Sequence, residues 1–330
     1  MRTKIFGTLG PRCHEAALLK KMIEEGMSGV RLNLSHVSLE ESSEWLAQWK
    51  EASEGRLDLL VDMQGPEMRI GSFEKELEFD EGDRVDVPMR PEVVSFLKEG
   101  QEVLLDDGKI LARVLRPGEV TSFRMQRSGA LSGGKSVKIP GLENTLPALT
   151  AHDRKNIQDA KRFGVTGVMQ PFVRGAGDLR ALRQALLEAD AGDIRIFAKI
   201  ENKRGIAQIE EILEEADWIV IARGDLGNDM NLWELPGAQR TIAAACRKKR
   251  VPFIVVTQML ASMEHSPVPT RAEISDIDHA ILDGALGVMV TGETAVGDYP
   301  VEVMKYLSKT VAEAERYWEY ASGKSKKIAF

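Results

Sequence analysis

The chain has 330 residues, 43% of them hydrophobic and 29% charged, so it is long enough to bury one large core or two ordinary ones. Its formal net charge of −7 is not the basic balance of a nucleic-acid-binding protein, although a local positive cleft could still take a small anion. Two distant cysteines, Cys13 and Cys246, indicate neither a disulfide framework nor a zinc site and fit a reducing cytoplasm, and no apolar segment is long enough for secretion or a membrane span.

Short apolar, β-branched segments alternate with longer amphipathic segments along most of the chain, which is typical of parallel strands joined by helices. We predict eight such strands, at residues 3–9, 29–35, 57–63, 167–173, 194–200, 217–223, 252–258 and 286–292. Helical patterns lie near 14–26, 38–53, 152–163, 177–189, 204–215, 236–249 and 271–284, with a last helix near 299–319. Eight strand–helix units predict an α/β fold of the closed (β/α)8 TIM-barrel type rather than an open sheet.

One interval interrupts this alternation. Residues 71–146 contain short strand-like segments punctuated by Gly, Pro and Asp, and they predict a small β-barrel-like domain inserted after the third strand. Residues 1–70 and 147–330 then form the barrel. Active sites of this fold lie where the strands end, so an insertion at that face is expected to act as a lid. A surface domain without a role in the site is the alternative.

Polar residues follow the predicted strands where they end, and in a barrel these ends converge on one mouth. They are Arg31, Asn33, Ser35 and His36, then Asp62, then Lys199, Glu201 and Asn202, then Arg223 and Asp225, then Thr257 and Gln258, and finally Thr291, Glu293 and Thr294. Each alone has a structural explanation: Asn33 and Ser35 as helix caps, Asp62 as a turn former, or Lys199 and Glu201 as a local ion pair. Together they predict a functional site, because semi-buried charges are costly unless paired or coordinated.

Two of these carboxylates suggest a metal site. Glu201 and Asp225 end neighbouring strands and can reach one hard cation, and so few protein ligands favour Mg²⁺, which completes its shell from water and substrate oxygens. Two solvated acids are the alternative. Arg31, Arg69 and Lys199 supply the positive charge that suits a phosphorylated, carboxylated substrate. Phosphoryl transfer fits this set, since it needs positioning and charge neutralisation rather than a covalent nucleophile.

Several longer motifs occur in a fixed order. They include TKIFGTLGP (3–11), GVRLNLSH (29–36), GPEMRIG (65–71), LPALTAHD (146–153), AKIENKRGI (198–206), IARGDLG (221–227), VTQMLASM (256–263), PTRAEISD (269–276) and TGETAVGDYP (291–300). In this order the chain resembles the pyruvate kinase family over nearly its whole length. The resemblance implies a barrel with a capping β domain, which converts phosphoenolpyruvate and ADP to pyruvate and ATP using Mg²⁺ (or Mn²⁺) and usually K⁺.

The resemblance also implies roles for residues at the substrate. Glu201 and Asp225 would hold Mg²⁺, and Lys199 would neutralise the transferring phosphoryl group and the nascent enolate. Backbone amides near Gly224 and Asp225, together with Thr257, would bind the substrate carboxylate. Thr257 would also help to protonate the enolate carbon.

Further roles are implied for phosphate and nucleotide binding. Arg31 would hold the substrate phosphate. Arg69, His36 and Lys135 match contacts to the ADP phosphates, with Asn33 beside them, and Lys135 would come from the lid. Arg69 would then take part in catalysis together with Arg31.

A potassium site is implied by the same resemblance. Asn33, Ser35, Asp62 and the backbone of Met63 would hold K⁺, and Glu67 matches the acidic residue typical of K⁺-dependent members. We therefore expect activation by K⁺.

The sequence departs from the family pattern at a few positions. Met63 and Gln64 replace a usual Thr-Lys pair, and Pro171 replaces a usual serine. The capping domain is shorter than usual, and the sequence ends after the last predicted barrel helix, so we expect neither the family's C-terminal domain nor its usual effector control.

Other functions stay open. A metal-dependent enolpyruvate lyase or aldolase, or a phosphoenolpyruvate hydrolase, would need the metal pair but no ADP groove. A non-catalytic relative could bind phosphometabolites. We expect the protein to be a cytoplasmic homo-oligomer formed through the barrel, with no nucleic-acid or membrane partner.

Overall fold

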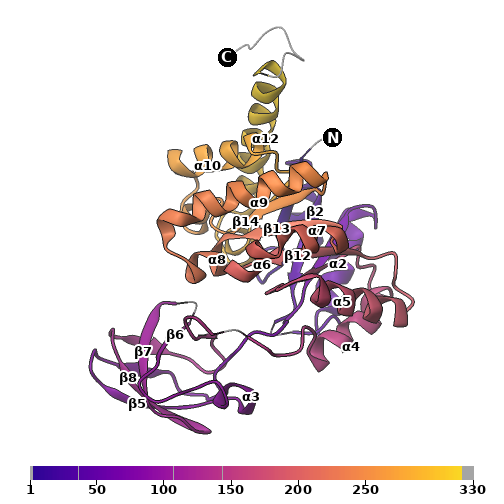
Figure 1. Cartoon of the computed structure of the whole chain (residues 1–330). Helices are drawn as coiled ribbons and strands as arrows, with labels where there is room; N and C mark the ends of the chain where they lie inside the picture. The colour runs from indigo at the N-terminus through magenta and orange to yellow at the C-terminus, as the bar shows by residue number, and fades with distance from the viewer. Residues whose placement is uncertain (1–2, 36, 107, 143, 322–330) are drawn as a thin grey trace. The chain divides into compact units, whose positions relative to one another are not determined.

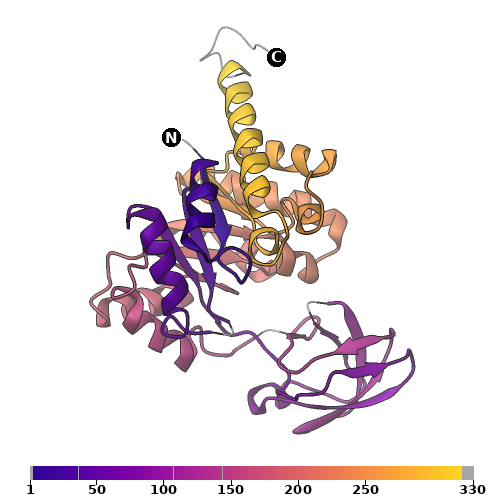
Figure 2. The ribbon, with the colours of Figure 1, turned by 180° about the vertical axis from the view of Figure 1, so that it is seen from behind.

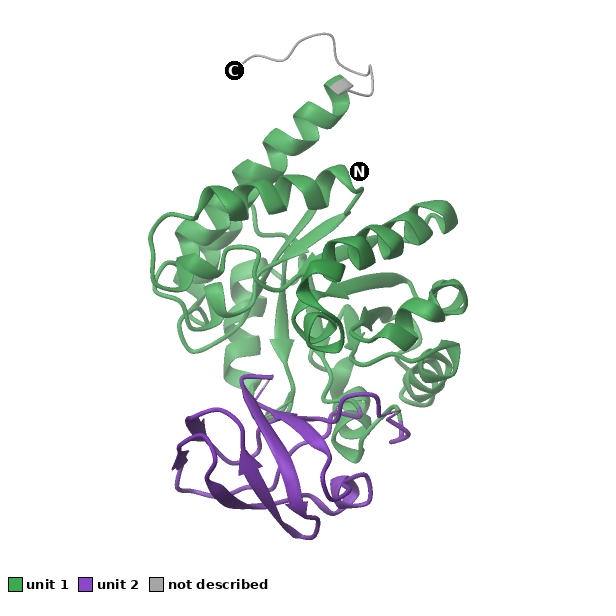
Figure 3. Ribbon diagram, turned by 60° about the vertical axis from the view of Figure 1, so that its left-hand side comes forward, with its two compact units in different colours: residues 1–65, 148–330 green, residues 66–147 purple. Residues whose placement is uncertain are grey.

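The protein divides into two compact units, shown in green and purple in Figure 3. The computed structural model describes residues 3–35, 37–106, 108–142 and 144–321. Unit 1 comprises Met1–Gly65 and Ala148–Phe330, and unit 2 comprises Pro66–Pro147. A proline therefore stands on the unit 2 side of both crossings, where it restricts the backbone of the connection.

Unit 1 contains a closed barrel of eight parallel strands, which confirms the predicted (β/α)8 fold. Around the barrel the order is β1, β15, β14, β13, β12, β11, β3 and β2, so each strand pairs with its neighbours in this series and β2 pairs again with β1. The strands are β1 (Lys4–Thr8), β2 (Gly29–Asn33), β3 (Asp58–Asp62), β11 (Gly167–Gln170), β12 (Arg195–Ile200), β13 (Trp218–Ala222), β14 (Phe253–Val256) and β15 (Gly287–Met289).

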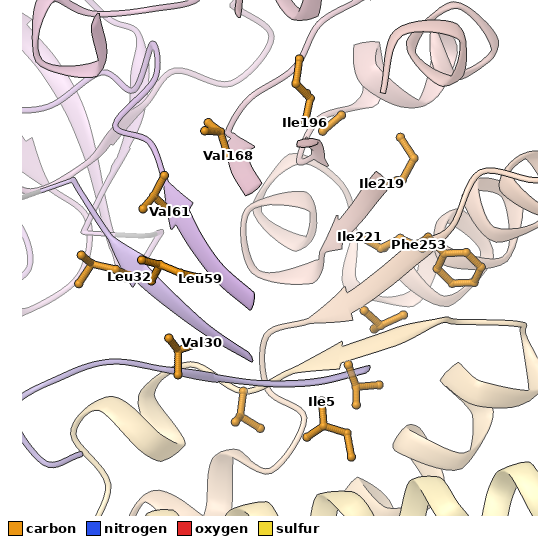
Figure 4. Close-up of a cluster of buried hydrophobic side chains, with 14 of the residues drawn as sticks. Ile5, Val30, Leu32, Leu59, Val61, Val168, Ile196, Ile219, Ile221 and Phe253 are labelled. Carbon is orange, nitrogen blue, oxygen red and sulfur yellow. The ribbon is translucent and has the colours of Figure 1, made fainter. Parts of the chain in front are cut away.

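The barrel wall is apolar on both faces because side chains alternate along each strand. One set of buried side chains forms the inner cluster: Phe6, Leu60, Met169, Phe197, Trp218, Val220, Ala222, Ile254, Val256, Met289. Alternate positions belong to a second cluster with the surrounding helices, and Figure 4 shows ten of them labelled, from Ile5 on β1 to Phe253 on β14. Burial on both faces is typical of parallel strands and explains why they read as continuous apolar segments.

Helices surround this barrel (Figures 1 and 2). They are α1 (Ala16–Glu24), α2 (Ser43–Ser53), α4 (Ala151–Ala160), α5 (Ala176–Glu188), α6 (Lys203–Ala207), α7 (Ile209–Glu215), α8 (Arg223–Asp229), α9 (Leu235–Lys249), α10 (Arg271–Leu282), α11 (Gly292–Ala295) and α12 (Pro300–Ala321), with short 3₁₀ turns η1 (Leu232–Glu234) and η2 (Ala261–Glu264). The predicted helix at 204–215 is two helices, α6 and α7, which meet at Gln208. Among the described residues, none of the helices is both long enough and apolar enough to cross a membrane.

Unit 2 is built from antiparallel strands around its own apolar cluster. Its larger sheet has the order β10, β6, β7, β8, β5, and β4 pairs with β9 in a second sheet. The elements are β4 (Leu77–Phe79), β5 (Arg84–Pro88), α3 (Pro91–Val94), β6 (Glu102–Leu105), β7 (Ile110–Arg116), β8 (Val120–Met125), β9 (Gly129–Leu131) and β10 (Val137–Lys138).

Asp58 joins three barrel strands at their amino-terminal ends. Its carboxylate forms ion pairs with Lys4 of β1 and Arg195 of β12, and the hydroxyl of Thr166 donates to it over 3.1 Å. Burial alone would raise the pKa of Asp58, but the two cations outweigh burial and lower the pKa below its ordinary value. Asp58 therefore stabilises the barrel at the end opposite the predicted mouth.

We predict that Asp58→Asn lowers the free energy of unfolding at pH 7 by about 1–3 kcal/mol, less than for a fully buried pair because solvent screens part of the interaction. The folded-state pKa lies below the ordinary value of 3.8, so this stabilisation is present above pH 3.8 and is lost as the pH falls through the lower folded value. Urea unfolding at pH 7 and pH 3 should show the difference shrinking at pH 3. Asp190→Asn, which breaks the exposed pair with Lys161, is the control and should leave stability nearly unchanged. Equal effects of both substitutions would contradict the prediction.

Candidate active site

Four of the predicted charged residues meet at the carboxyl ends of the barrel strands. Asp62 is the last residue of β3 and pairs in register with Asn33, the last residue of β2. Lys199 lies near the end of β12, and Glu201 follows that strand directly. Arg31 shares with Asn33 the inward side of β2, since the two are separated by one residue.

Asp62 is the centre of this group. Its carboxylate oxygen Oδ2 accepts from Nε of Arg31 over 2.9 Å and lies 2.8 Å from Arg31 Nη2. The Nζ of Lys199 lies 3.1 and 3.0 Å from the two Asp62 oxygens and 3.0 Å from Oε1 of Glu201. All four side chains are at most 13% exposed, so water screens these interactions weakly. The explanation of Asp62 as a simple turn former is therefore wrong.

These contacts fix the protonation states of Asp62 and Lys199. Burial would raise the pKa of Asp62, yet the charges of Lys199 and Arg31 outweigh it and lower the pKa. Burial would lower the pKa of Lys199, yet the Asp62 and Glu201 carboxylates outweigh it and raise the pKa. Lys199 is thus a permanent positive charge at neutral pH rather than a group that gives up its proton.

The surroundings of Glu201 disfavour its ionised form, unlike those of Asp62 and Lys199. Burial, and then the negative charges of Asp225 and Asp62, raise its pKa to about 7, although Lys199 opposes the shift. Its Oε2 accepts a hydrogen bond from the backbone N–H of Phe172 over 2.7 Å. With all groups ionised, Arg31 and Lys199 give this group two positive charges, and Asp62, Glu201 and Asp225 give it three negative charges.

This arrangement fits a divalent cation at Glu201 and Asp225. A cation there would offset the negative charges of Asp225 and Asp62, which together with burial raise the pKa of Glu201. Among the residues that the structure describes, no three or more His, Cys, Asp or Glu side chains are grouped to hold a metal on their own. The remaining ligands would have to be water and substrate oxygens, as is usual for Mg²⁺.

Thr257 and Gln258 follow β14 in an unusual conformation. Their φ angles are +77° and +55°, in the left-handed region that non-glycine residues rarely adopt. Strain of this kind costs on the order of 1–3 kcal/mol per residue and occurs mainly at functional sites. The methyl group of Thr257 packs against Gly224, where an added Cβ would lie only 3.1 Å from it. Thr257 is thereby brought beside the α8 turn that carries Asp225.

The residues predicted for a potassium site lie on adjacent strand ends. Oδ1 of Asn33 accepts from the backbone N–H of Ser35 over 3.1 Å. Neither residue is a helix cap, because the next helix, α2, begins at Ser43. Met63 is 2% exposed and belongs to the second apolar cluster, between the strands and the surrounding helices. Its side chain points away from the mouth, so methionine in place of the family's usual threonine removes nothing from the mouth itself. Only the backbone of Met63 remains available to a cation.

Asp153 is a supporting residue that the sequence did not reveal. Its carboxylate accepts from the backbone N–H groups of Gln64 and Gly65 over 2.8 and 3.1 Å, while also capping α4 at Thr150. Gly65 has a φ of +60°, and a Cβ there would lie 2.5 Å from the ring of Pro171. The motif Thr-x-x-Asp predicts the cap. It gives no sign that the same carboxylate fixes the turn after Asp62.

The predicted nucleotide contacts lie partly in unit 2. The guanidinium of Arg69 pairs with Glu67 and donates to the carbonyl of Gly134 over 2.9 Å, next to Lys135 in the chain. Lys135 pairs with Asp106 at 2.9 Å. Arg69 and Lys135 are therefore neighbours within unit 2. His36, also predicted to contact ADP, lies outside the described residues.

Comparison with known proteins gives a consistent result. A family model described as pyruvate kinase, barrel domain, matches residues 1–304. The chain is 37% identical over 340 residues to a pyruvate kinase of Geobacillus stearothermophilus, covering 97% of this chain and 58% of that protein. It is 37% identical to a pyruvate kinase of Chlamydia trachomatis serovar D and 36% identical to one of Aeropyrum pernix, spanning 70% of each, with 97% and 94% of this chain covered.

The raised pKa of Glu201 predicts that binding of Mg²⁺ depends on pH. Below about pH 7 the carboxylate is protonated and must release its proton to bind a cation, so affinity should fall about tenfold between pH 8 and pH 6. Isothermal titration at pH 6 in buffers of different ionisation enthalpy should detect nearly one released proton. Glu201→Gln should bind weakly and without this pH dependence. An affinity for Mg²⁺ that is the same at both pH values in the unaltered protein would refute the assignment.

Proposed function

Because the chain belongs to the pyruvate kinase family, we propose that it transfers a phosphoryl group from phosphoenolpyruvate to ADP, forming pyruvate and ATP. The observation that carries this proposal is Lys199, buried as a permanent cation between Asp62 and Glu201 at the barrel mouth. A fixed charge in a site shielded from water is what stabilises a transferring phosphoryl group.

Metal dependence is general in this family. In this chain Glu201 and Asp225 would hold Mg²⁺ or Mn²⁺, which when bound supplies positive charge to the enol and phosphoryl oxygens. Asn33, Ser35, Asp62 and the backbone of Met63 would hold K⁺, and Glu67 makes this chain similar to the K⁺-dependent members.

The residues of the barrel mouth have separate roles in the proposed reaction. Arg31 and Lys199 both contact the Asp62 carboxylate, so a phosphoryl group that binds at the mouth would meet two cations already held in position. The bond from phosphorus to the enol oxygen breaks and a bond to a β-phosphate oxygen of ADP forms. Lys199 remains protonated throughout and offsets the charge left on the enolate.

The enolate then takes a proton at its terminal carbon to become pyruvate. Thr257 would help to deliver this proton, and the backbone near Gly224 and Asp225 would hold the carboxylate. This assignment is supported by the packing of Thr257 on Gly224. Arg69 and Lys135 of unit 2, with His36, would bind the ADP phosphates.

A cytoplasmic location is part of the same proposal and is supported by two buried cysteines that form no disulfide.

The direct test supplies phosphoenolpyruvate, ADP, Mg²⁺ and K⁺ and measures pyruvate and ATP together. We expect the two products in equal amounts, with a lower rate when K⁺ is replaced by a larger organic cation. Pyruvate without ATP would indicate a hydrolase or lyase instead, and absence of both products would favour a non-catalytic binding protein.

Lys199→Met should lower kcat by roughly 10³-fold or more, because it removes the cation nearest the transferring group. Binding of Mg²⁺ should be largely retained, since Glu201 and Asp225 remain. Lys161→Met, which removes an exposed lysine paired with Asp190, is the matched control and should leave kcat unchanged. Turnover of Lys199→Met within twofold of the unaltered enzyme would rule out this mechanism.

A further inference from the structure

The strained turn after β14 is held by a side chain from α8, the helix that follows the neighbouring strand β13. Arg223 is the first residue of α8, directly after β13, and β13 pairs with β14 in the barrel. Its Nε and Nη2 both donate to the backbone carbonyl of Thr257, over 3.2 and 2.7 Å. Nη2 also lies 3.4 Å from the carbonyl oxygen of Gln258 and 3.0 Å from the sulfur of Met259.

The other edge of the guanidinium is anchored outside the barrel. Nη1 of Arg223 lies 2.8 and 2.6 Å from the two carboxylate oxygens of Asp276 on α10. The Arg223 side chain is 11% exposed and that of Asp276 is 36% exposed, so the guanidinium is largely buried while its anchor on α10 is partly open to water. A planar guanidinium can make these two directed contacts at once, whereas an ammonium group cannot.

The contacts of Arg223 coincide with the left-handed backbone. Thr257 is β-branched, and its φ of +77° is unfavourable unless surrounding contacts impose it. The carbonyl that Arg223 holds with two donors belongs to this same residue. On the other side, Gly224 lies against the Thr257 methyl group. Arg223 and Gly224 are consecutive, so the first turn of α8 binds the Thr257 carbonyl through Arg223 and contacts the Thr257 side chain through Gly224.

From this geometry we propose that Arg223 is a positioning residue for the reaction: with Asp276 as its anchor, it holds Thr257 in the left-handed conformation that sets the Thr257 side chain against Gly224, the residue before Asp225. This inference rests on the proposed function. The guanidinium of Arg223 is engaged by Thr257 and Asp276, so its effect on turnover passes through Thr257.

A double-mutant cycle tests the proposal, using Arg223→Met, Thr257→Ala and the combination. Arg223→Met should lower kcat for pyruvate formation about 10- to 100-fold while changing KM for ADP less than twofold. In the Thr257→Ala background the same substitution should change kcat less than twofold, because the residue through which it acts is already lost. If the kcat losses of the two single variants multiply in the combined variant, or if Thr257→Ala keeps full activity, the proposal is overturned.

Two further variants separate positioning from general damage. Arg195→Met is the matched control, because Arg195 also donates to a backbone carbonyl, that of Thr166, and pairs with a carboxylate, Asp58, at the opposite end of the barrel. It should destabilise the fold without lowering kcat. If Arg223→Met does not fold, Asp276→Asn replaces it and should lower kcat about 3- to 10-fold in the unaltered background only.

A structural measurement keeps the inference independent of activity. If the unaltered protein forms no pyruvate or ATP, the proposed function has failed, but crystal structures of the unaltered and Arg223→Met proteins still decide the positioning claim. Return of Thr257 to a negative φ in the variant supports it. A φ near +77° without Arg223 overturns it, whatever the activity.

Discussion

The carboxylate of Asp62, buried between Arg31 and Lys199, is the interaction on which the barrel mouth depends. Two cations side by side in a site nearly closed to water would repel each other and lose their hydration, and Asp62 compensates both with contacts of 2.8 to 3.1 Å. The cost appears at Glu201, whose pKa is raised by burial and by the neighbouring Asp225 and Asp62 carboxylates, although Lys199 opposes the shift. The mouth thus combines two cations, each paired with Asp62, with a buried carboxylate whose charged form is disfavoured.

Two turns at the barrel mouth are held by carboxylates on the surrounding helices. Asp153 on α4 holds the turn after Asp62 through two backbone N–H groups, and Asp276 on α10 anchors Arg223, which holds Thr257. In both cases a carboxylate on a surrounding helix fixes a turn at a strand end. Preorganisation of this kind spares the reaction the cost of arranging its groups when substrate arrives.

The sequence predicted the barrel and the composition of its mouth, because both follow from periodicity. Strands buried on two faces appear as apolar runs, and closure of the barrel brings residues such as Arg31 and Lys199 together although they are far apart in the chain. The break at Gln208 was missed, since α6 and α7 keep a continuous amphipathic pattern across it. Alternation along β3 already places Met63 on the outer face, opposite Asp62, so the direction of its side chain could have been predicted. The contacts of Asp153 and Arg223 could not, because they join helices to strand ends through tertiary packing that no local pattern encodes.

The central claim is that Lys199 is a permanent cation held by Asp62, and the most direct measurement is an NMR titration of the Lys199 side chain labelled at Nζ or Cε. The account predicts no deprotonation up to pH 10.5, the ordinary pKa of lysine, and a lower pKa for Lys199 in Asp62→Asn than in the unaltered protein. Titration of Lys199 below pH 10.5 in the unaltered protein, or a pKa that Asp62→Asn leaves unchanged, would contradict it.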